Sequence, residues 1–472
     1  MSDEPKRKDV LPTGWLQRGA KIAGQTGRSA ARFVGTRART FAAPDRANEF
    51  LEGFHQQTAK QLVQMLGEMK GAAMKVGQLA SFYEFSAPSE YLATYKDALT
   101  MLQNSAPPMD PEASRQVIKE EFGAPAEEVF ATFDENAFAA ASIGQVHRAT
   151  LHSGEEVAVK VQYPGVDEAV RADLKNVSAM TKISVAIAPN IDPKEIANEV
   201  RDRVLEELDY RREASNQATF ADLYDGHPFI VVPKVYKDLC RARVITQEFI
   251  KGRPFPEAFG WEDQHAKDQL GETLWRFFFG SMNRFLLFSA DPHPGNYLLL
   301  PRGKVAFLDF GLVRAIDPGT LKLFVELGQA FVNDDKERGR SALEGMGILN
   351  RRTPEIDVVW EHMKMLNSPL VHKGPLKITP SLVQGIAAAG FDPRSPAFNT
   401  LRKVGIPGVV ITFNRMSFGV ASLMARLEAT AHWQGLAQEM WFGEPSETAL
   451  GKKEQAWLKK VHPDVPPSAH RT

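Results

Sequence analysis

The stretch that decides the fold is Asp291-Pro292-His293-Pro294-Gly295-Asn296, which is followed downstream by Asp309-Phe310-Gly311. Asn296 comes five residues after Asp291, and Asp309 comes thirteen residues after Asn296. Magnesium prefers carboxylate, amide and water oxygens, so Asn296 and Asp309 are candidate metal ligands. Asp291 is the candidate group that orients or deprotonates an attacking hydroxyl or water. Either motif alone also occurs as an ordinary turn, and their order and spacing therefore carry the prediction.

These separations are those of the catalytic-loop Asp, the metal-binding Asn and the D-F-G Asp of protein kinases. Upstream, Val157-Ala158-Val159-Lys160 has the form of the kinase strand whose lysine contacts the nucleotide phosphates. A lysine on a strand edge is common by itself. Its place ahead of the other motifs, in the order that a kinase requires, favours a phosphate contact for Lys160.

An alanine-rich segment precedes that strand in the frame of a G-x-G-x-x-G-x-V loop, with alanine in place of the first two glycines. Small residues let the backbone approach phosphates, but alanine resists positive φ, so we expect a stiffer loop that grips nucleotide differently. Taken alone, an alanine-rich turn is more often plain packing. The expected nucleotide-binding set is Ala139, Ala140, Ala141, Ser142, Ile143, Gly144, Val146, Lys160 and, in a strand predicted near 244–249, Glu248.

A kinase also needs a glutamate on a helix to hold the phosphate-binding lysine. A charged helix is predicted over 193–224, and its segment 206–213 is the only dense acidic helical stretch between the lysine strand and the later strands. The partner of Lys160 is therefore Glu207 or Glu213. A charge run of this kind is more often a solvated helix face.

The order of elements predicts an α+β, bilobal, protein-kinase-like fold with a helical extension in front. Two hairpins are expected, one joining strands at 146–151 and 156–161 through Ser153-Gly154, the other spanning 297–300 and 304–308. A short strand is also expected near 229–232. The predicted divisions are a basic amphipathic or disordered arm (1–44), the helical extension (45–108), a strand-rich lobe (109–252), a helix-rich lobe (253–451) and a disordered tail (452–472).

Composition is that of a globular protein, with 472 residues, 43% hydrophobic and 24% charged, and a formal net charge of -1. The near-neutral charge gives no reason to expect nucleic acid as a partner. A single cysteine, Cys240, rules out a disulfide within the chain and fits a reducing compartment. No uninterrupted apolar run approaches the roughly 18–20 residues of a spanning helix, since the best stretch, 405–411, is closed off by Asn414 and Arg415.

We therefore expect a soluble, cytoplasmic protein or one peripheral to the inner face of a membrane. The peripheral alternative rests on the basic, amphipathic amino terminus, which could lie on an anionic lipid surface. A disordered basic arm is the other interpretation of this segment.

Taken together, the motifs resemble the UbiB/AarF atypical kinases, a family linked to ubiquinone biosynthesis and lipid homeostasis. The resemblance is carried by Lys75-Val76-Gly77-Gln78 (the family's K-x-G-Q), the alanine-rich loop, Glu207-Leu208-Asp209 (its E-x-D), and the two motifs at 291–296 and 309–311. It covers residues 49–315 firmly and the remaining helices loosely.

The resemblance implies that the leading helix folds over the nucleotide cleft, with Lys75 and Gln78 where a peptide substrate would otherwise lie. Glu207 and Asp209 would pair with that helix, which leaves Glu213 as the better partner for Lys160. The implied catalytic set is then Asp291, Lys160, Glu213, Glu207, Asp209, Lys75 and Gln78, acting on ATP with Mg²⁺ held by Asn296 and Asp309.

The segment between Asp309 and a helix predicted to start near Pro318 is too short for a protein kinase activation segment, and no A-P-E follows. The expected function is therefore that of an ATPase or a small-molecule or lipid kinase serving isoprenoid quinone or membrane-lipid metabolism. The alternative is a nucleotide-gated scaffold for membrane-associated enzymes, with little turnover.

Overall fold

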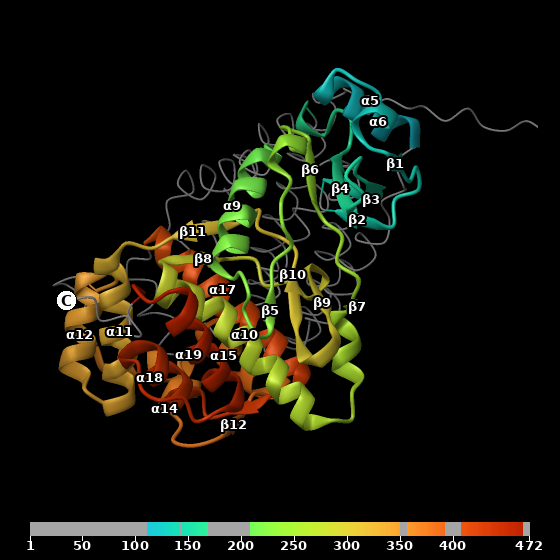
Figure 1. Ribbon diagram of the computed structural model, residues 1–472. Helices are drawn as coiled ribbons and strands as arrows, with labels where there is room; N and C mark the ends of the chain where they lie inside the picture. Colours follow the sequence, from blue (N-terminus) through green and yellow to red (C-terminus); the bar gives the residue numbers. More distant parts are fainter. Residues whose placement is uncertain (1–110, 142, 169–207, 350–355, 392–406, 466–472) are drawn as a thin grey trace, which may run out of the picture. The chain divides into compact units, whose positions relative to one another are not determined.

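The computed structural model describes residues 111–141, 143–168, 208–349, 356–391 and 407–465 (Figure 1). The chain divides into two compact units, each described separately below. The first ends at Arg211 and includes Leu239–Thr246, and the second comprises Arg212–Asp238 and the chain from Gln247 onward. Most of the helix at 210–223 belongs to the second unit, and the predicted boundary between the lobes after residue 252 stays a prediction. The predicted arm (1–44) and the whole of the predicted helical extension (45–108) lie outside the described residues.

The first unit is built on a five-stranded sheet in the order β1-β3-β4-β6, with β2 paired to β3. Its strands are β1 (Thr132–Phe133), β2 (Ala139–Ala141), β3 (Gly144–Thr150), β4 (Glu156–Gln162) and β6 (Val244–Glu248). β3 and β4 form the predicted antiparallel hairpin, and Gly154 in its turn has φ +98°, a conformation that favours glycine. The helices α5 (Pro111–Phe122) and α6 (Ala126–Val129) precede the sheet.

A buried polar cluster ties α5 to this sheet. The His147 ring, fully buried on β3, bonds to the Ser114 hydroxyl at 3.0 Å and to the Asp134 carbonyl at 2.9 Å. Because that carbonyl can only accept, Nδ1 of His147 carries a hydrogen and Nε2 is an acceptor. The neutral ring therefore satisfies both bonds, and burial lowers the pKa of His147 from its ordinary value.

The second unit contains three small sheets among helices (Figure 1). A four-stranded sheet has the order β5-β10-β9-β7, β8 pairs with β11, and β12 pairs with β13. The strands are β5 (Ile230–Val231), β7 (Arg253–Pro254), β8 (Leu287–Ser289), β9 (Tyr297–Leu299), β10 (Val305–Phe307), β11 (Val313–Ala315), β12 (Leu376–Lys377) and β13 (Thr430–Ala431). β9 and β10 form the second predicted hairpin.

Helices make up most of the second unit. The α-helices are α9 (Tyr210–Leu223), α10 (Gln264–Phe285), α11 (Pro318–Asn333), α12 (Lys336–Gly345), α13 (Ile356–Leu366), α14 (Ser368–Val371), α15 (Pro380–Phe391), α17 (Gly408–Leu427), α18 (Trp433–Phe442) and α19 (Ala449–Val461). Short 3-10 turns are η3 (Lys237–Leu239), η4 (Phe255–Gly260), η5 (Pro294–Asn296) and η6 (Pro301–Gly303). The start of α11 at Pro318 agrees with the predicted helix start.

The helix α10 runs through the core of the second unit. Asp263 caps its amino terminus by accepting a hydrogen bond from the Ala266 amide at 3.1 Å. Leu286 ends it in the left-handed conformation, and β8 begins at the next residue. On α10, Phe277 stacks on Phe307 of β10 with ring centroids 3.7 Å apart. The same helix therefore supports the β9–β10 hairpin and leads directly into β8.

A buried ion network joins α10 to the carboxyl-terminal helices. The Arg276 side chain is 0% exposed and bonds to Glu272 at 2.7 Å, Glu439 at 2.9 Å and Glu454 at 2.7 Å. Arg284 pairs with Glu454 at 2.6 Å. Burial would raise the pKa of Glu454, but Arg284 and Arg276 hold it well below its usual range. The Glu454 carboxylate is therefore ionised, with two arginines beside it.

The predicted disordered tail from residue 452 is wrong for residues 452–461, which belong to α19. Thr448 caps this helix by accepting from the Gly451 amide at 3.0 Å. Glu454 reaches the ion network, and the buried Trp457 donates to the Asp225 carbonyl at 2.8 Å. Two long-range anchors thus hold this helix, and its apolar residues Leu450, Trp457 and Leu458 recur at helical spacing, a signal that the prediction of disorder overlooked.

One helix of the described residues, α17, is long and apolar enough to cross a membrane by length and composition, with a mean hydropathy of 1.3. Asn414 and Arg415 still interrupt the apolar run, as the sequence indicated, but the helix continues through them. Within the second unit, Met416, Val420 and Leu423 of α17 are buried in the core cluster that also contains α10 residues. A core helix meets the same two criteria as a membrane span, so the hydropathy of α17 is weak evidence for one.

Replacement of Arg276 by methionine should lower the free energy of unfolding of the second unit by about 3–5 kcal/mol, because it leaves buried carboxylates uncompensated. A guanidinium titration followed by tryptophan fluorescence reports on this unit, since every tryptophan except Trp15 lies in it. Arg340→Met is the matched control, because the Arg340–Glu344 pair is exposed and worth about 0.3–0.5 kcal/mol. A loss below about 1 kcal/mol for Arg276→Met would contradict the network's structural role.

The first unit should lose stability as the pH falls below about 6.5, the ordinary pKa of histidine. The folded state holds His147 neutral with a lowered pKa, so the unfolded chain binds a proton at a higher pH than the folded chain does. Acid therefore stabilises the unfolded state relative to the folded state. Hydrogen exchange of the β3 and β4 amides between pH 7.5 and 5.5 measures this loss of stability. His147→Gln, which keeps a donor and an acceptor without titrating, should flatten the dependence. An unchanged slope in that variant would assign the acid lability to other groups.

Candidate functional site

Asn296 and Asp309 are brought together by the β9–β10 hairpin. Tyr297 lies opposite Phe307 in its register, and the Leu308 amide donates to the Asn296 carbonyl at 2.9 Å. Asp309 follows Leu308 directly, so the two candidate metal ligands stand side by side at the end of one ladder. Both side chains are partly exposed. The metal-binding role that the sequence spacing predicted for this pair stays a prediction.

A second ladder brings Asp291 to the same place. β8 pairs with β11 so that Ser289 faces Val313, and the Ala290 amide donates to the Leu312 carbonyl at 2.8 Å. Asp291 therefore emerges beside the residues that immediately follow the D-F-G turn. The two ladders therefore bring all three candidate residues close to the D-F-G turn.

The buried Tyr297 hydroxyl lies near two of these carboxylates. Burial raises the pKa of Tyr297 well above its ordinary value, and the negative charges of Asp291 and Asp309 raise it further. Both carboxylates thus lie close enough to one buried group to disfavour a charge on it.

Short local bonds preform the two loops. In the catalytic loop, the Gly295 amide donates to Nδ1 of His293 at 3.2 Å, and the Asn296 amide donates to the His293 carbonyl at 3.0 Å. In the D-F-G turn, the Gly311 amide donates to Oδ1 of Asp309 at 2.9 Å. The polar groups of the site are therefore held in place by the chain itself before any ligand binds.

One face of α9 packs on the D-F-G turn. The Asn216 side chain donates to the Phe310 carbonyl at 3.0 Å, and the Phe220 ring lies 5.0 Å from the Phe310 ring. Glu213, one helical turn before, is buried, and its Oε2 would lie 3.8 Å from a Cβ placed on Gly311. Residues 213, 216 and 220 recur at helical spacing and form one face. The candidate lysine partner Glu213 therefore lies beside the metal-binding turn.

In the first unit, Lys160 lies on β4 opposite Val146 of β3. Its ammonium group is 4.9 Å from the centre of the Tyr210 ring, within the range of a cation–π contact. The side chain is partly exposed, in agreement with a lysine that reaches toward a ligand. Whether Glu213 or Glu207 holds it stays a prediction.

The alanine-rich segment forms the β2–β3 hairpin. Ala139 and Ala140 are exposed, Ala141 pairs with Gly144, and Ile143 is buried. A Cβ on Gly144 would lie 2.1 Å from the Val161 carbonyl oxygen of β4. Glycine at 144 is thus required because a neighbouring strand approaches closely. The glycine-rich loop motif does not indicate this reason.

The remaining predicted site residues either make local contacts or lie outside the described residues. Asp209 is bound by its neighbour Arg211 through a two-pronged contact, with distances of 2.9 and 2.7 Å. Glu248, exposed at the end of β6, accepts from the Lys234 amide at 3.3 Å. Ser142, Lys75, Gln78 and Glu207 lie outside the described residues, and their roles stay predictions.

Sequence reasoning missed Arg415 of α17, whose guanidinium binds Oδ1 of Asp291 at 2.5 Å. In the sequence this arginine was noticed only as the residue that closes an apolar stretch. No local pattern pairs it with a loop more than a hundred residues away, so only the tertiary structure could reveal the contact.

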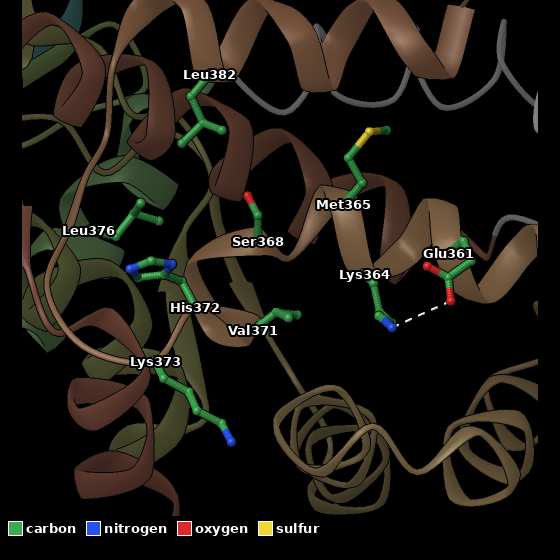
Figure 2. Close-up of a pocket in the computed structure, with 9 residues that line it drawn as sticks. All are labelled: Glu361, Lys364, Met365, Ser368, Val371, His372, Lys373, Leu376 and Leu382. Atoms are coloured by element: carbon green, nitrogen blue, oxygen red, sulfur yellow. Dashed lines mark hydrogen bonds and ion pairs between the residues drawn. The ribbon is translucent and has the colours of Figure 1, made fainter.

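A cavity of about 590 Å³ lies elsewhere in the second unit, among α13, α14, β12 and α15. Figure 2 shows Lys364 directed toward Glu361 at its edge, with Leu376, Leu382 and Met365 among the other lining residues. None of the residues predicted to bind nucleotide or metal lines it. Its size alone does not make it the site, because the convergent polar groups lie at the catalytic loop.

Within the described residues, no cluster of three or more histidine, cysteine, aspartate or glutamate side chains could hold a metal by itself. One carboxylate from Asp309 and one amide from Asn296 suit Mg²⁺, which takes its remaining ligands from water and phosphate oxygens. The donor set therefore fits a metal that arrives with a nucleotide better than a permanent structural ion.

These features define a protein-kinase-like fold of mixed α and β structure, with a strand-rich unit carrying Lys160 and a helix-rich unit carrying the catalytic loop and the D-F-G turn. The chain belongs to the ABC1 atypical kinase-like domain family, whose model matches residues 101–342. The resemblance to the UbiB/AarF kinases is thereby confirmed.

Several named proteins are similar to this chain. "Atypical kinase COQ8B, mitochondrial" of Rattus norvegicus is 34% identical over 281 residues, which are 59% of this chain and 52% of the rat protein. "Probable protein kinase UbiB" of Pseudomonas paraeruginosa is 34% identical over 233 residues, 48% of this chain and 43% of that protein. The chain thus spans about half the length of these relatives.

A solved structure is also similar, the Rv3197–erythromycin complex from Mycobacterium tuberculosis. It has a TM-score of 0.61 and 32% identity, and the match covers 84% of this chain and 100% of that one. This match covers a larger share of the chain than the family model does.

Replacement of Asn216 by alanine should loosen the D-F-G turn, because the Phe310 carbonyl loses its side-chain donor. We expect about 1–3 kcal/mol less stability in the second unit and a measurably weaker affinity for Mg-nucleotide. Thr219→Ala, on an exposed position of the same helix, is the control. Denaturant unfolding and titration with Mg-ADP check both effects, and wild-type values for Asn216→Ala would show that the turn does not need α9.

Proposed function

We propose that this protein is a Mg-ATP-dependent ATPase or a small-molecule or lipid kinase that supports isoprenoid quinone (ubiquinone) biosynthesis or membrane-lipid homeostasis. The observation that carries the proposal is the convergence of Asp291, Asn296 and Asp309 at the D-F-G turn, enforced by the β8–β11 and β9–β10 ladders. Phosphoryl transfer requires chiefly positioning and charge stabilisation, which such a preformed site supplies.

Each residue has a role in this proposal. Asn296 and Asp309 would hold Mg²⁺, which would neutralise charge on the nucleotide phosphates. Asp291 would accept the proton of an attacking water or hydroxyl. Lys160 would contact the phosphates, and Glu213 would orient Lys160. The D-F-G turn would keep Asp309 in place through its Gly311 amide.

A small acceptor is favoured over a protein. The chain passes from Asp309 through β11 into α11 at Pro318, where Asp317 caps the helix by accepting from the Thr320 amide at 2.9 Å. This short, capped connection offers no extended segment for docking a peptide. The family resemblance adds that Lys75 and Gln78 would cover the peptide site.

The metabolic assignment rests on the relatives named COQ8B and UbiB and on the family's link to ubiquinone biosynthesis. A lipid or quinone-precursor acceptor would bring the protein to a membrane surface, in keeping with the basic amino-terminal segment. A cytoplasmic protein peripheral to the inner face of a membrane is the location that these features support.

Two substitutions separate binding from turnover. Asp309→Asn should weaken Mg-nucleotide binding at least about tenfold, because it removes a charged metal ligand. Asp291→Asn should leave nucleotide affinity within about threefold of the wild type but lower ATP turnover by about 10²–10⁴-fold. Calorimetric titration with Mg-ADP and a phosphate-release assay measure the two quantities. Asp357→Asn, at an exposed site, is the control.

The outcomes discriminate between the functions. Unchanged binding and turnover in Asp309→Asn would contradict the proposal. Tight nucleotide binding with negligible turnover that Asp291→Asn does not change would instead favour a nucleotide-gated scaffold. Adding anionic lipid vesicles or phenolic quinone-precursor mimics to the wild type tests the acceptor class, and strong stimulation of turnover is expected from at least one of them.

A further inference from the structure

The candidate base Asp291 is bound by an arginine from a helix far away in the sequence. The Arg415 guanidinium and Oδ1 of Asp291 are 2.5 Å apart, and their side chains are 15% and 25% exposed. A pair this well shielded from water interacts more strongly than a surface pair and tolerates less displacement. Since Arg415 binds Oδ1, Oδ2 is the oxygen that remains to accept a proton.

A second contact between α17 and the catalytic loop lies one helical turn further on. A Cβ placed on Gly419 would lie 2.3 Å from Cγ of Pro292, the residue after Asp291. The proline ring is rigid, so any side chain at 419 would push the loop and the helix apart. Arg415 and Gly419 are four residues apart and share one helix face, which meets two consecutive residues of the loop.

The helix that makes these contacts is anchored to the same core as the loop. Met416 and Val420, each one residue beyond the contact positions, are fully buried in the core cluster of the second unit. That cluster also contains Phe288 of β8, the strand that delivers Asp291. The loop is thus held from two sides, by the β8–β11 ladder and by α17.

We propose that Arg415 is a positioning residue for Asp291, and that Gly419 is there to let α17 approach closely enough for the pair to form. The inference rests on the proposed role of Asp291 as proton acceptor. Arg415 holds the Asp291 carboxylate in one rotamer and balances its negative charge, which lies near that of Asp309. Because residue 419 has no side chain, Pro292 can pack directly against α17. Neither residue contacts the nucleotide in this scheme.

The first test compares Arg415→Met and Arg415→Lys with Arg426→Met, a control that removes another arginine of α17. We expect Arg415→Met to lower kcat of ATP hydrolysis about 10–100-fold, as a misplaced catalytic group does, with KM and the Kd for Mg-ADP within about threefold of the wild type. Arg415→Lys, which keeps the charge, should recover part of the loss. Arg426→Met should stay within about twofold in kcat.

The second test leaves the charge in place. Gly419→Ala should lower kcat about tenfold with nucleotide affinity kept, because the loop shifts away from α17. Gly408→Ala is the matched control on the same helix, since a Cβ there meets nothing within 4 Å. If Arg415→Met does not fold, as judged by its thermal unfolding, Gly419→Ala and Arg415→Lys decide the question.

The failure of this inference differs from that of the proposed function. If Asp291→Asn turns over ATP like the wild type, the proposed function fails whatever Arg415 does. If Asp291→Asn is inactive while Arg415→Met and Gly419→Ala retain kcat within about twofold, only the positioning role is overturned. A parallel loss of Mg-ADP affinity in Arg415→Met would overturn it too, since it would mean a direct ligand contact.

Adding Arg415→Met to Asp291→Asn provides a final check. If Arg415 acts through Asp291, the second substitution should cause less than about a twofold further loss of residual turnover, because its target is gone. If the decrease in ATP turnover of the double variant equals the product of the decreases in the two single variants, the proposal is contradicted.

Discussion

The candidate site depends on the pairing of two short backbone ladders around one turn. The Leu308 amide bonded to the Asn296 carbonyl and the Ala290 amide bonded to the Leu312 carbonyl place three functional side chains together. Backbone bonds of this kind leave little freedom to the residues that follow them. The placement of Asp291 and Asp309 is therefore specified by strand register, and a slip of one residue in either ladder would turn a carboxylate away from the candidate site.

The sequence allowed this part of the molecule to be predicted because its signals are local. The hairpin at 297–308 and the D-F-G turn are short-range features, and the helix starting at Pro318 carries a capping aspartate just before it. The number of residues between these motifs therefore indicated which of them lie next to each other in the fold. The β3–β4 hairpin with Gly154 in its turn is the same kind of signal, and it placed Lys160 on the correct strand.

The features that sequence reasoning missed are mostly long-range. Arg276 meets Glu439 and Glu454 only after α18 and α19 fold back on α10, and the order of α19 depends on those contacts. This segment was therefore expected to be disordered, and the helical spacing of its apolar residues was overlooked. Gly144 is likewise required because the Val161 carbonyl of the neighbouring strand lies so close to it. That neighbour lies outside the sequence motif that contains Gly144. Partners of this kind become visible only once the packing is known.

A common anchor underlies these separate observations. α10 carries Arg276, stacks Phe277 on the β9–β10 hairpin, and leads directly into β8, whose last residue, Ser289, lies two positions before Asp291. α17 is buried in the same core and brings Arg415 to that aspartate from the other side. A charged residue in so apolar a helix carries a desolvation cost that an exposed helix face would avoid. The ion pair with Asp291 offsets part of that cost, and the cost is therefore best understood as a consequence of holding this carboxylate in place.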